Sequence, residues 1–410
     1  MKYIALLGHG VVGSGVTELF IKNRTSIERK AGTELDIKYI LDVRDFPDHP
    51  LADRFTKDFE QIVNDDEVTV VVEVIGGLDP AYTFVKRALE SGKSVVTSNK
   101  ELVATHGAEL LKIAKDNNLN FLFEASVGGG IPIIRPLSQC LSANELIEIA
   151  GILNGTTNYI LTKMVEEGVS FDEALKTAQE LGYAERNPSA DIDGADTCRK
   201  ICILAALAFG NHIYPNQVHT EGIRNITLRD IEDAKKLGGI VKLIGSAAMR
   251  EDGKVSIFVA PCIVSKLSQL YHVDDVFNAI LVKGDAIGDV LFYGRGAGKM
   301  PTASAVVADI IDSVKHIAAR KMLSWADAQP EKVADFSELK TSYYVRCSRN
   351  ENSDALISSV FGAVNYVEGC ADGDISFVTS VSTERDLKEK CTRLAENGTE
   401  IYSTLRVINL

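Results

Sequence analysis

The sequence predicts an α/β protein that begins with a doubly wound parallel sheet, continues into an α+β domain and ends in a small βαββαβ module. Three observations lead to this prediction. A Gly-x-Gly-x-x-Gly run follows an apolar segment at the N-terminus, apolar runs then alternate with amphipathic stretches, and the C-terminal part has a strand and helix order of its own. Such an alternation is typical of a parallel sheet with helices on both faces.

Length and composition describe an ordinary globular chain of two or three domains. The 410 residues are 45% hydrophobic and 25% charged, and 44 Lys+Arg against 57 Asp+Glu give a net charge of −13, which argues against a nucleic-acid partner. The longest apolar stretch, Ile201 to Phe209, is well short of the roughly 20 residues that cross a bilayer. No signal peptide is recognised, so we expect a cytoplasmic protein without a membrane partner. The seven cysteines form no CxxC pair, and we expect them to be core hydrophobes.

The first elements predict a dinucleotide-binding site. Tyr3 to Leu7 is an apolar run typical of a strand buried on both faces, and the glycine run from Gly8 to Gly13 follows it directly. In this fingerprint the first glycine permits a tight turn, the second lets the backbone approach a pyrophosphate, and the third lets the helix pack closely. The helix N-terminus then faces the phosphates. A glycine-rich turn without a ligand is the alternative; we favour a Rossmann domain that binds NAD or NADP.

The end of the second strand bears on the choice of cofactor. The strand covers Ile37 to Val43, and Asp42, Arg44 and Asp45 lie at its end. An acid there would accept hydrogen bonds from the ribose 2′-hydroxyl of NAD, whereas a basic side chain would bind the 2′-phosphate of NADP. A solvated charged loop is the competing interpretation, and the choice between NAD and NADP stays open.

Two further βα steps complete the sheet. A strand from Val68 to Ile75, a helix from Pro80 to Ser91 and a strand within Lys93 to Lys100 follow one another. Ligands bind beyond the carboxyl ends of such strands. The residues at these ends, which we expect on the cofactor side, are Gly76, Thr97, Ser98 and Lys100. Because a helix N-terminus disfavours a positive charge, Lys100 is more readily explained by a function than by chance.

Two loops in the middle of the chain are open to more than one interpretation. An apolar strand from Phe121 runs into Gly128 to Gly130, whose carbonyls together with Glu124 could hold a hard cation. From the spacing alone, a plain flexible turn is favoured. A strand from Glu145 to Leu153 leads to Asn154 to Asn158, which suits a binding loop or a helix N-cap equally, with a helix beginning near Tyr159.

The segment from Leu181 to Lys200 is the most informative. A helix begins near Gly194 and is apolar on every face from Ile201 onward, which predicts burial. Asp196 and Lys200 are four residues apart and share one face, so Lys200 is expected to point into the protein. Burial disfavours its charge and Asp196 favours it, which is how a lysine is tuned to deliver a proton. The alternative is an ordinary surface pair. Cys198 and Cys202 share a face, but core packing explains them better than zinc.

The rest of the chain carries fewer signals. Alternating strands and helices are expected from Thr220 to Phe292, followed by a glycine cluster, Tyr293 to Thr302, and a helix from about Ala303 to Ala319. This cluster could touch a ligand or serve as a hinge. After a polar link at Gln329, the pattern from Tyr343 to Ile408 follows the βαββαβ order of a ferredoxin-like module. We find no catalytic constellation there and expect binding or dimerisation.

Taken together, these motifs resemble homoserine dehydrogenase over residues 1 to about 322, and the tail resembles an ACT domain, an amino-acid-sensing module. The motifs that carry the resemblance are Gly8–Gly13, Ser98–Lys100, Glu124–Pro132, Asn154–Asn158, Leu181–Glu185, Asp191–Asp196 with Lys200, and Gly296–Gly298. In the tail, Arg349 to Asp354 replaces the Pro-Gly turn that usually follows the first ACT strand. The implied domains are residues 1–133 with a returning helix at 300–322 for the dinucleotide, 134–299 for substrate and dimerisation, and 338–410 for the ACT-like module.

The resemblance implies NAD(P)-dependent interconversion of L-homoserine and L-aspartate 4-semialdehyde in threonine and methionine biosynthesis. It implies a homodimer or homotetramer and a possible amino-acid effector at the tail. Lys200 would be the general acid/base, and Lys100 would orient substrate and nicotinamide. The implied substrate-binding residues are Glu185, Asp196, Gly155 and Thr156. The implied cofactor-binding residues are Gly8, His9, Gly10, Val11, Val12, Gly13, Arg44, Gly76, Thr97, Ser98, Lys100, Gly182, Glu185 and Gly298. The resemblance also implies a site for sodium or another monovalent cation, formed by Glu124 and the carbonyls of Val127, Gly129 and Ile131.

Two other functions stay possible from the residues themselves. One is a dehydrogenase of another amino-acid semialdehyde or hydroxy acid. The other is a non-catalytic NAD(P)-binding sensor, against which the set of Lys100, Glu185, Asp196 and Lys200 argues, because a sensor needs no buried proton donor.

Overall fold

The computed structural model describes residues 1–319, 323–369 and 373–409, so the last residues of the predicted returning helix, 320–322, lie outside the description. The chain divides into two compact units, and each is described by itself. The first comprises Met1–Glu145, Cys202–Pro215 and Phe292–Gln329, and the second comprises Leu146–Ile201, Asn216–Leu291 and Pro330–Leu410.

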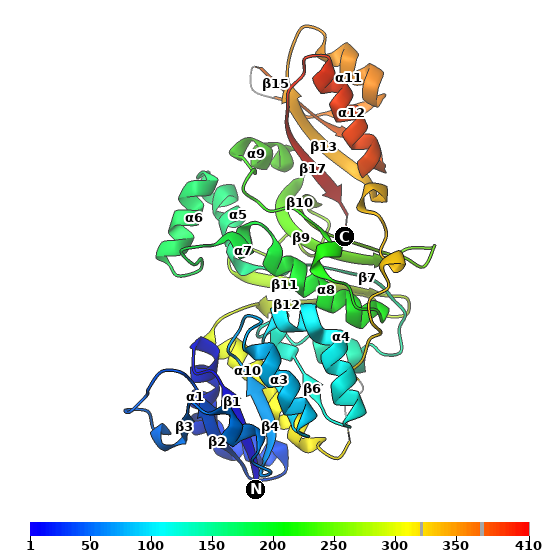
Figure 1. The fold of residues 1–410 in the computed structure, drawn as a ribbon. Coiled ribbons are helices and arrows are strands. Elements are labelled where there is room, and N and C mark those ends of the chain that lie inside the picture. The colour runs from blue at the N-terminus through cyan, green and yellow to red at the C-terminus, as the bar shows by residue number, and fades with distance from the viewer. Residues whose placement is uncertain (320–322, 370–372, 410) are drawn as a thin grey trace. The chain divides into compact units, whose positions relative to one another are not determined.

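The first unit is built on a parallel six-stranded sheet with the order β3-β2-β1-β4-β5-β6 (Figure 1). The strand order reverses beside β1, which is where doubly wound sheets bind their ligands. The strands are β1 (Lys2–Leu7), β2 (Leu35–Leu41), β3 (Phe55–Thr56), β4 (Val68–Glu73), β5 (Ser94–Thr97) and β6 (Phe121–Leu122). The helices are α1 (Val11–Ala31), α2 (Phe59–Val63), α3 (Ala81–Glu90), α4 (Lys100–Asp116) and α10 (Lys299–Lys315).

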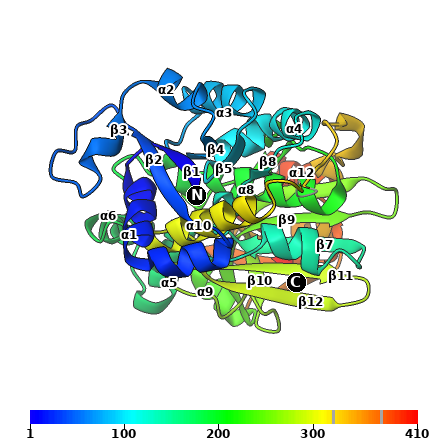
Figure 2. The same ribbon diagram turned by 90° about the horizontal axis from the view of Figure 1, so that it is seen from below.

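The expected central strand and returning helix are both present in this unit. Ile4, Leu6 and Leu7 of β1 have no exposed surface, and burying each of these side chains contributes about 1.5–3 kcal/mol. Helix α10 lies beside α1 (Figure 2). A Cβ atom on Gly15 would lie 2.9 Å from the Cβ atom of Ala303, so the fourth glycine of the N-terminal run permits this close helix packing.

The second unit contains most of a mixed eleven-stranded sheet. Its main path is β12-β11-β7-β9-β10-β17-β13-β15-β14, with β8 paired to β10 and β16 paired to β13. The strands are β7 (Leu146–Ile152), β8 (His219–Thr220), β9 (Gly239–Met249), β10 (Val255–Ser265), β11 (Phe277–Gly284), β12 (Gly288–Arg295), β13 (Lys340–Ser348), β14 (Val364–Tyr366), β15 (Asp374–Thr379), β16 (Ser382–Thr383) and β17 (Ile401–Ile408). The helices are α5 (Gly155–Glu167), α6 (Phe171–Glu180), α7 (Ser189–Ile192), α9 (Leu228–Lys236), α11 (Ser353–Phe361) and α12 (Glu384–Glu396). Helix α8 (Ala195–Phe209) begins in this unit, and its residues from Cys202 onward belong to the first unit.

The C-terminal elements follow the expected βαββαβ order, with the short strand β16 added. Their strands have the order β17-β13-β15-β14, and one face packs on α11 and α12 around Tyr343, Ile357, Phe377 and Leu394. Strand β17 also pairs in parallel with β10, with Cys262 opposite Arg406. The tail is therefore continuous with the sheet of the second unit.

Several expectations are corrected. Helix α5 begins at Gly155 and not near Tyr159, because Asn154 accepts a hydrogen bond from the Thr157 backbone N–H at 2.8 Å and caps the helix. The region after Thr220 consists mainly of the long strands β9 to β12, with α9 as its main helix. Among the described cysteines, Cys140 is exposed and is no core residue, whereas four others are buried; Cys370 lies outside the description. Within the described residues, no helix is both long and apolar enough to span a membrane.

Candidate active site

The glycine turn after β1 has the backbone that the motif predicts. Gly8 has a φ of +99°, and its N–H donates to the Leu41 carbonyl at 2.8 Å. A Cβ atom on Gly13 would lie 2.1 Å from the Gly8 carbonyl oxygen, whereas a Cβ atom on Gly10 would meet nothing within 4 Å. Gly10 is the N-cap of α1, so the space beside the helix N-terminus is kept clear where a phosphate would bind.

Arg44 and Asp42 form one unit at the end of β2. The Arg44 guanidinium donates to both Asp42 carboxylate oxygens, at 3.0 and 2.9 Å, and to the His9 carbonyl at 3.0 Å. The His9 backbone N–H also donates to Asp42, at 2.8 Å. These hydrogen bonds, that of the Arg44 side chain above all, hold the pKa of Asp42 well below its usual range. Asp42 has 7% of its side chain exposed and Arg44 has 58%, so the cation of the pair faces solvent.

A buried carboxylate that sequence reasoning missed connects the loops after β4 and β5. Glu73 has no exposed surface, and it accepts hydrogen bonds from the backbone N–H groups of Ile75 at 2.8 Å and Gly76 at 3.1 Å. It also accepts one from the Thr97 hydroxyl. Burial raises the pKa of Glu73. The signal was present as a single acid in an apolar run, Val68 to Ile75, which was treated only as a strand.

Helix α4 places Lys100 at its first turn. Asn99 caps the helix by accepting from the Leu102 N–H at 3.1 Å, and its amide donates to the Gly77 carbonyl at 2.6 Å. Lys100 is half-buried and Ser98 precedes the cap. The Glu73 side chain thus joins the predicted cofactor-side residues Gly76 and Thr97, and the Ser98 N–H donates to the Glu73 main-chain carbonyl at 3.3 Å.

The Glu124 carboxylate accepts hydrogen bonds from the backbone of the segment that follows the glycines. It accepts from the backbone N–H groups of Ile133 at 2.6 Å, Ile134 at 2.8 Å and Arg135 at 2.9 Å. Arg135 also pairs with Asp309 at 2.9 Å, and burial raises the pKa of Asp309 to about 7. These N–H donors use three of the roughly four lone-pair sites of the Glu124 carboxylate, so the main-chain oxygens of the loop are freer to bind a cation. Cation binding at this loop stays a prediction.

The two glycine clusters are in contact and are not plain flexible turns. The Gly130 N–H donates to the Arg295 carbonyl at 3.1 Å, and a Cβ atom on Gly129 would lie 2.3 Å from the Gly296 carbonyl oxygen. Gly298 is the N-cap of α10 with a φ of +116°. Glycine is therefore required in this contact by close backbone approach, whatever ligand binds nearby.

Lys200 lies in a buried cluster, which we call the lysine cluster: Asn154, Asp191, Asp196 and Lys200. Its Nζ donates to the Leu153 carbonyl at 2.6 Å and lies 2.7 Å from Asp196 Oδ2. Lys200 is 6% exposed and Asp196 3%, which excludes the interpretation as a surface pair. The Asn154 amide donates to Asp196 at 2.9 Å and to Asp191 at 2.7 Å. The sequence offered Asn154 to Asn158 as a binding loop or an N-cap, and Asn154 is the N-cap of α5; its contacts with Asp191 and Asp196 were not predicted.

The remaining predicted substrate residues lie around the start of α5. The Thr156 hydroxyl donates to the Tyr183 carbonyl at 2.7 Å, which connects α5 to the loop after α6. Glu185 and Gly182 are exposed on that loop, in contrast to the buried Asp196. Binding by these residues stays a prediction.

Comparison with known proteins identifies the family of this chain. A family model described as "Homoserine dehydrogenase, NAD binding domain" matches residues 8–124, and one described as "Homoserine dehydrogenase" matches residues 132–311. The chain belongs to the homoserine dehydrogenases. The enzyme is therefore an NAD(P)-dependent oxidoreductase that acts on a CH–OH group, and the sensor and other dehydrogenases are not favoured.

Individual relatives support the same family. A homoserine dehydrogenase of Synechocystis is 38% identical, with 99% of each chain covered, and one of Bacillus subtilis is 42% identical over 77% of this chain and 73% of its own. The enzyme is also similar to the crystal structure of a homoserine dehydrogenase from Thiobacillus denitrificans, with a TM-score of 0.89, 35% identity and coverage of 100% and 98%. A hyperthermophilic archaeal homoserine dehydrogenase in complex with NADPH matches with a TM-score of 0.64 and 30% identity over 76% of this chain and 98% of its own.

Proposed function

We propose that Lys200 exchanges the proton with the substrate oxygen in the interconversion of L-homoserine and L-aspartate 4-semialdehyde. The observation that carries this proposal is the buried Nζ atom, held between the Asp196 carboxylate and the Leu153 carbonyl. Bound NAD(P) supplies or accepts the hydride. Lys200 donates a proton as negative charge develops on the aldehyde oxygen, and in the reverse direction it takes the proton of the hydroxyl.

The other residues of the proposal hold the substrate in place. Asp196 and Glu185 balance the substrate ammonium group, and Gly155 and Thr156 line its site at the N-terminus of α5, where backbone N–H groups suit a carboxylate. Lys100 orients the substrate against the nicotinamide. Asn154 already accepts from the Thr157 N–H at 2.8 Å, so in this proposal the N–H groups of Gly155 and Thr156 bind the substrate carboxylate.

Substitution of Asn154 tests the lysine cluster. Asn154→Asp keeps an oxygen that caps α5, but it removes the N–H donors and adds a carboxylate beside Asp191 and Asp196. The added charge favours protonated Lys200, so we expect the acidic limb of the pH profile for homoserine oxidation to move to higher pH. We expect kcat/KM at neutral pH to fall about 10²-fold.

Asn154→Ser is the matched control, because serine caps helices and adds no charge. Its kcat/KM should fall by less, and its pH profile should stay in place. An unchanged pH profile for Asn154→Asp would contradict the proposed link between Asn154 and Lys200.

For the cofactor, we propose that Gly8 to Gly13 bind the pyrophosphate and that Arg44 binds the 2′-phosphate of NADP. The exposed guanidinium beside the turn supports this assignment. The NADPH complex of the archaeal relative is consistent with it.

A sodium ion at residues 124–131 would be held by the main-chain oxygens of Glu124, Val127, Gly129 and Ile131, and by no carboxylate.

For the tail, we propose that residues 338–410 form an ACT-like module, beside a dinucleotide domain of residues 1–133 and 300–322 and a substrate domain of residues 134–299. The archaeal relative matches only 76% of this chain over 98% of its own, which supports an appended module.

We also propose a cytoplasmic homodimer or homotetramer. Steady-state rates with NADPH and with NADH, each measured with and without threonine, test for an amino-acid effector; equal rates would count against threonine.

A further inference from the structure

Strands β8 and β17 lie end to end along one edge of β10. Strand β8 pairs in parallel with its first half, with Phe258 opposite His219, and β17 pairs in parallel with its second half, with Cys262 opposite Arg406. The chain leaves β10 after Glu221, whose N–H still donates to the Val259 carbonyl at 2.8 Å. Arg406, from the C-terminal tail, therefore lies next to the point where this loop begins.

An ion pair joins the two strands at this point. The Arg406 guanidinium donates to both Glu221 carboxylate oxygens at 2.8 Å, and its Nε donates to Glu384 at the start of α12. Arg406 is 5% exposed. Burial opposes the charge of Glu221, but hydrogen bonds from His219 and Arg406 lower its pKa to about 2, so the carboxylate is ionised at neutral pH.

The loop that follows Glu221 packs directly on the segment 189–194. The Ile223 N–H donates to the Ile192 carbonyl at 2.9 Å, and a Cβ atom on Gly222 would lie 2.1 Å from the same oxygen. Arg224 pairs with Asp193. The segment 189–194 includes Asp191 and leads into α8, which carries Asp196 and Lys200.

We propose that Arg406 and Glu221 are positioning residues for the substrate end of the active site. Arg406 of the tail fixes the position of Glu221, and the loop 221–224 in turn fixes the segment 189–194. This segment determines where Asp191 and Asp196 lie. The inference rests on the proposed role of the lysine cluster. It gives the tail a part in substrate binding that requires no effector.

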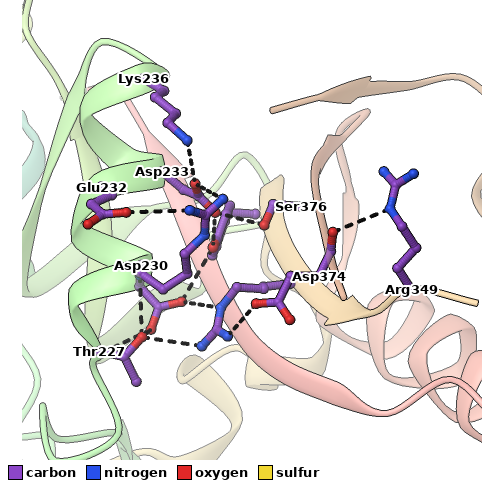
Figure 3. A network of polar contacts seen from close by, with 11 residues as sticks. Thr227, Asp230, Glu232, Asp233, Lys236, Arg349, Asp374 and Ser376 are labelled. Atoms are coloured by element: carbon purple, nitrogen blue, oxygen red, sulfur yellow. Dashed lines mark hydrogen bonds and ion pairs between the residues drawn. The ribbon is translucent and has the colours of Figure 1, made fainter. Parts of the chain in front are cut away.

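A second attachment of the tail offers a matched control. On β13, Arg346 donates to Asp230 at 3.1 Å and to Thr227 at 3.2 Å, and Tyr344 and Ser376 donate to Asp233 of α9 at 2.9 and 2.7 Å (Figure 3). Arg346 is 9% exposed. Both arginines are buried, lie on tail strands and pair with a carboxylate outside the tail, but Arg346 pairs with α9 and not with the loop 221–224.

The test compares Arg406→Met with Arg346→Met in the full-length enzyme. Both should lower the Tm. Only Arg406→Met should raise the KM for homoserine, by about fivefold, with the KM for NADP unchanged within error. Glu221→Gln, a milder change, should reproduce the KM effect, and the double variant Glu221→Gln/Arg406→Met should be no worse than the worse single variant.

Hydrogen exchange gives a readout that does not depend on the assigned catalytic roles. The amide of Ile223 and the amides of residues 191–196 should exchange faster in Arg406→Met than in Arg346→Met. Equal KM effects in the two variants, or unchanged exchange in Arg406→Met, would overturn the proposal. Faster exchange with an unchanged KM would show that Arg406 stabilises the segment 189–194 but that the lysine cluster does not bind homoserine. This result would also overturn the positioning role.

Discussion

Replacing Lys200 by alanine is expected to lower kcat for homoserine oxidation about 10³-fold, because a general acid/base contributes about 10²–10⁴ to the rate. The Nζ atom is buried with Asp196 and the Leu153 carbonyl, and alanine has no group that could exchange a proton at this position. The Kd for NADPH, measured by fluorescence titration, should change little, since the glycine turn and Arg44 lie in the other unit.

Two further variants separate proton transfer from charge. Lys200→Arg keeps a positive charge that does not dissociate at working pH, so it should be nearly as inactive as Lys200→Ala in the oxidation direction. Lys112→Ala removes a lysine that pairs with Asp116 four residues along α4, but whose side chain is 72% exposed, and it should leave kcat unchanged. If Lys200→Arg retained a tenth or more of the wild-type rate, the proton-transfer role would be refuted.

The lysine cluster shows which parts of the candidate site could be predicted from the sequence and which could not. The spacing of Asp196 and Lys200 and the apolar run after Ile201 were enough to predict a buried pair, because both signals lie within one helix. Asn154 and the Leu153 carbonyl come from a segment about 40 residues earlier in the chain. No local pattern indicates such a partner, because it depends on how β7 and α8 pack.

The fold shows the same limit. The strand, glycine turn and helix at the N-terminus were predictable, since each is a local feature and they are adjacent. The βαββαβ order of the tail was also predictable from periodicity. The parallel pairing of β17 with β10 was not, because the register joins Arg406 to Cys262 across more than a hundred residues. The backbone N–H donors to the Glu124 carboxylate were not predictable for a related reason: they follow a turn whose geometry the three glycines do not specify.

Replacing Arg44 by alanine is expected to shift the enzyme from NADP toward NAD through two effects. The variant loses the cation that we assign to the 2′-phosphate, and a hydrogen bond to a charged partner is worth about tenfold to a hundredfold in binding. It also releases Asp42, whose carboxylate Arg44 now covers. With an ordinary pKa of about 3.9, the released Asp42 stays ionised at neutral pH, repels the phosphate and accepts a hydrogen bond from the 2′-hydroxyl of NAD.

The measurement is kcat/KM for NADPH and for NADH in Arg44→Ala, in Asp42→Ala/Arg44→Ala and in Arg87→Ala. Arg87 is a close match to Arg44: it binds both oxygens of Glu60, at 2.7 and 2.8 Å, and lies 5.2 Å from the Phe59 ring, as Arg44 lies 5.1 Å from the Phe46 ring. It is on α3, away from the end of β2, so Arg87→Ala should keep the wild-type preference. If repulsion by the released Asp42 contributes, the double variant regains part of the activity with NADPH and loses the gain with NADH. An Arg44→Ala enzyme with an unchanged ratio of the two kcat/KM values would show that Arg44 does not bind the 2′-phosphate.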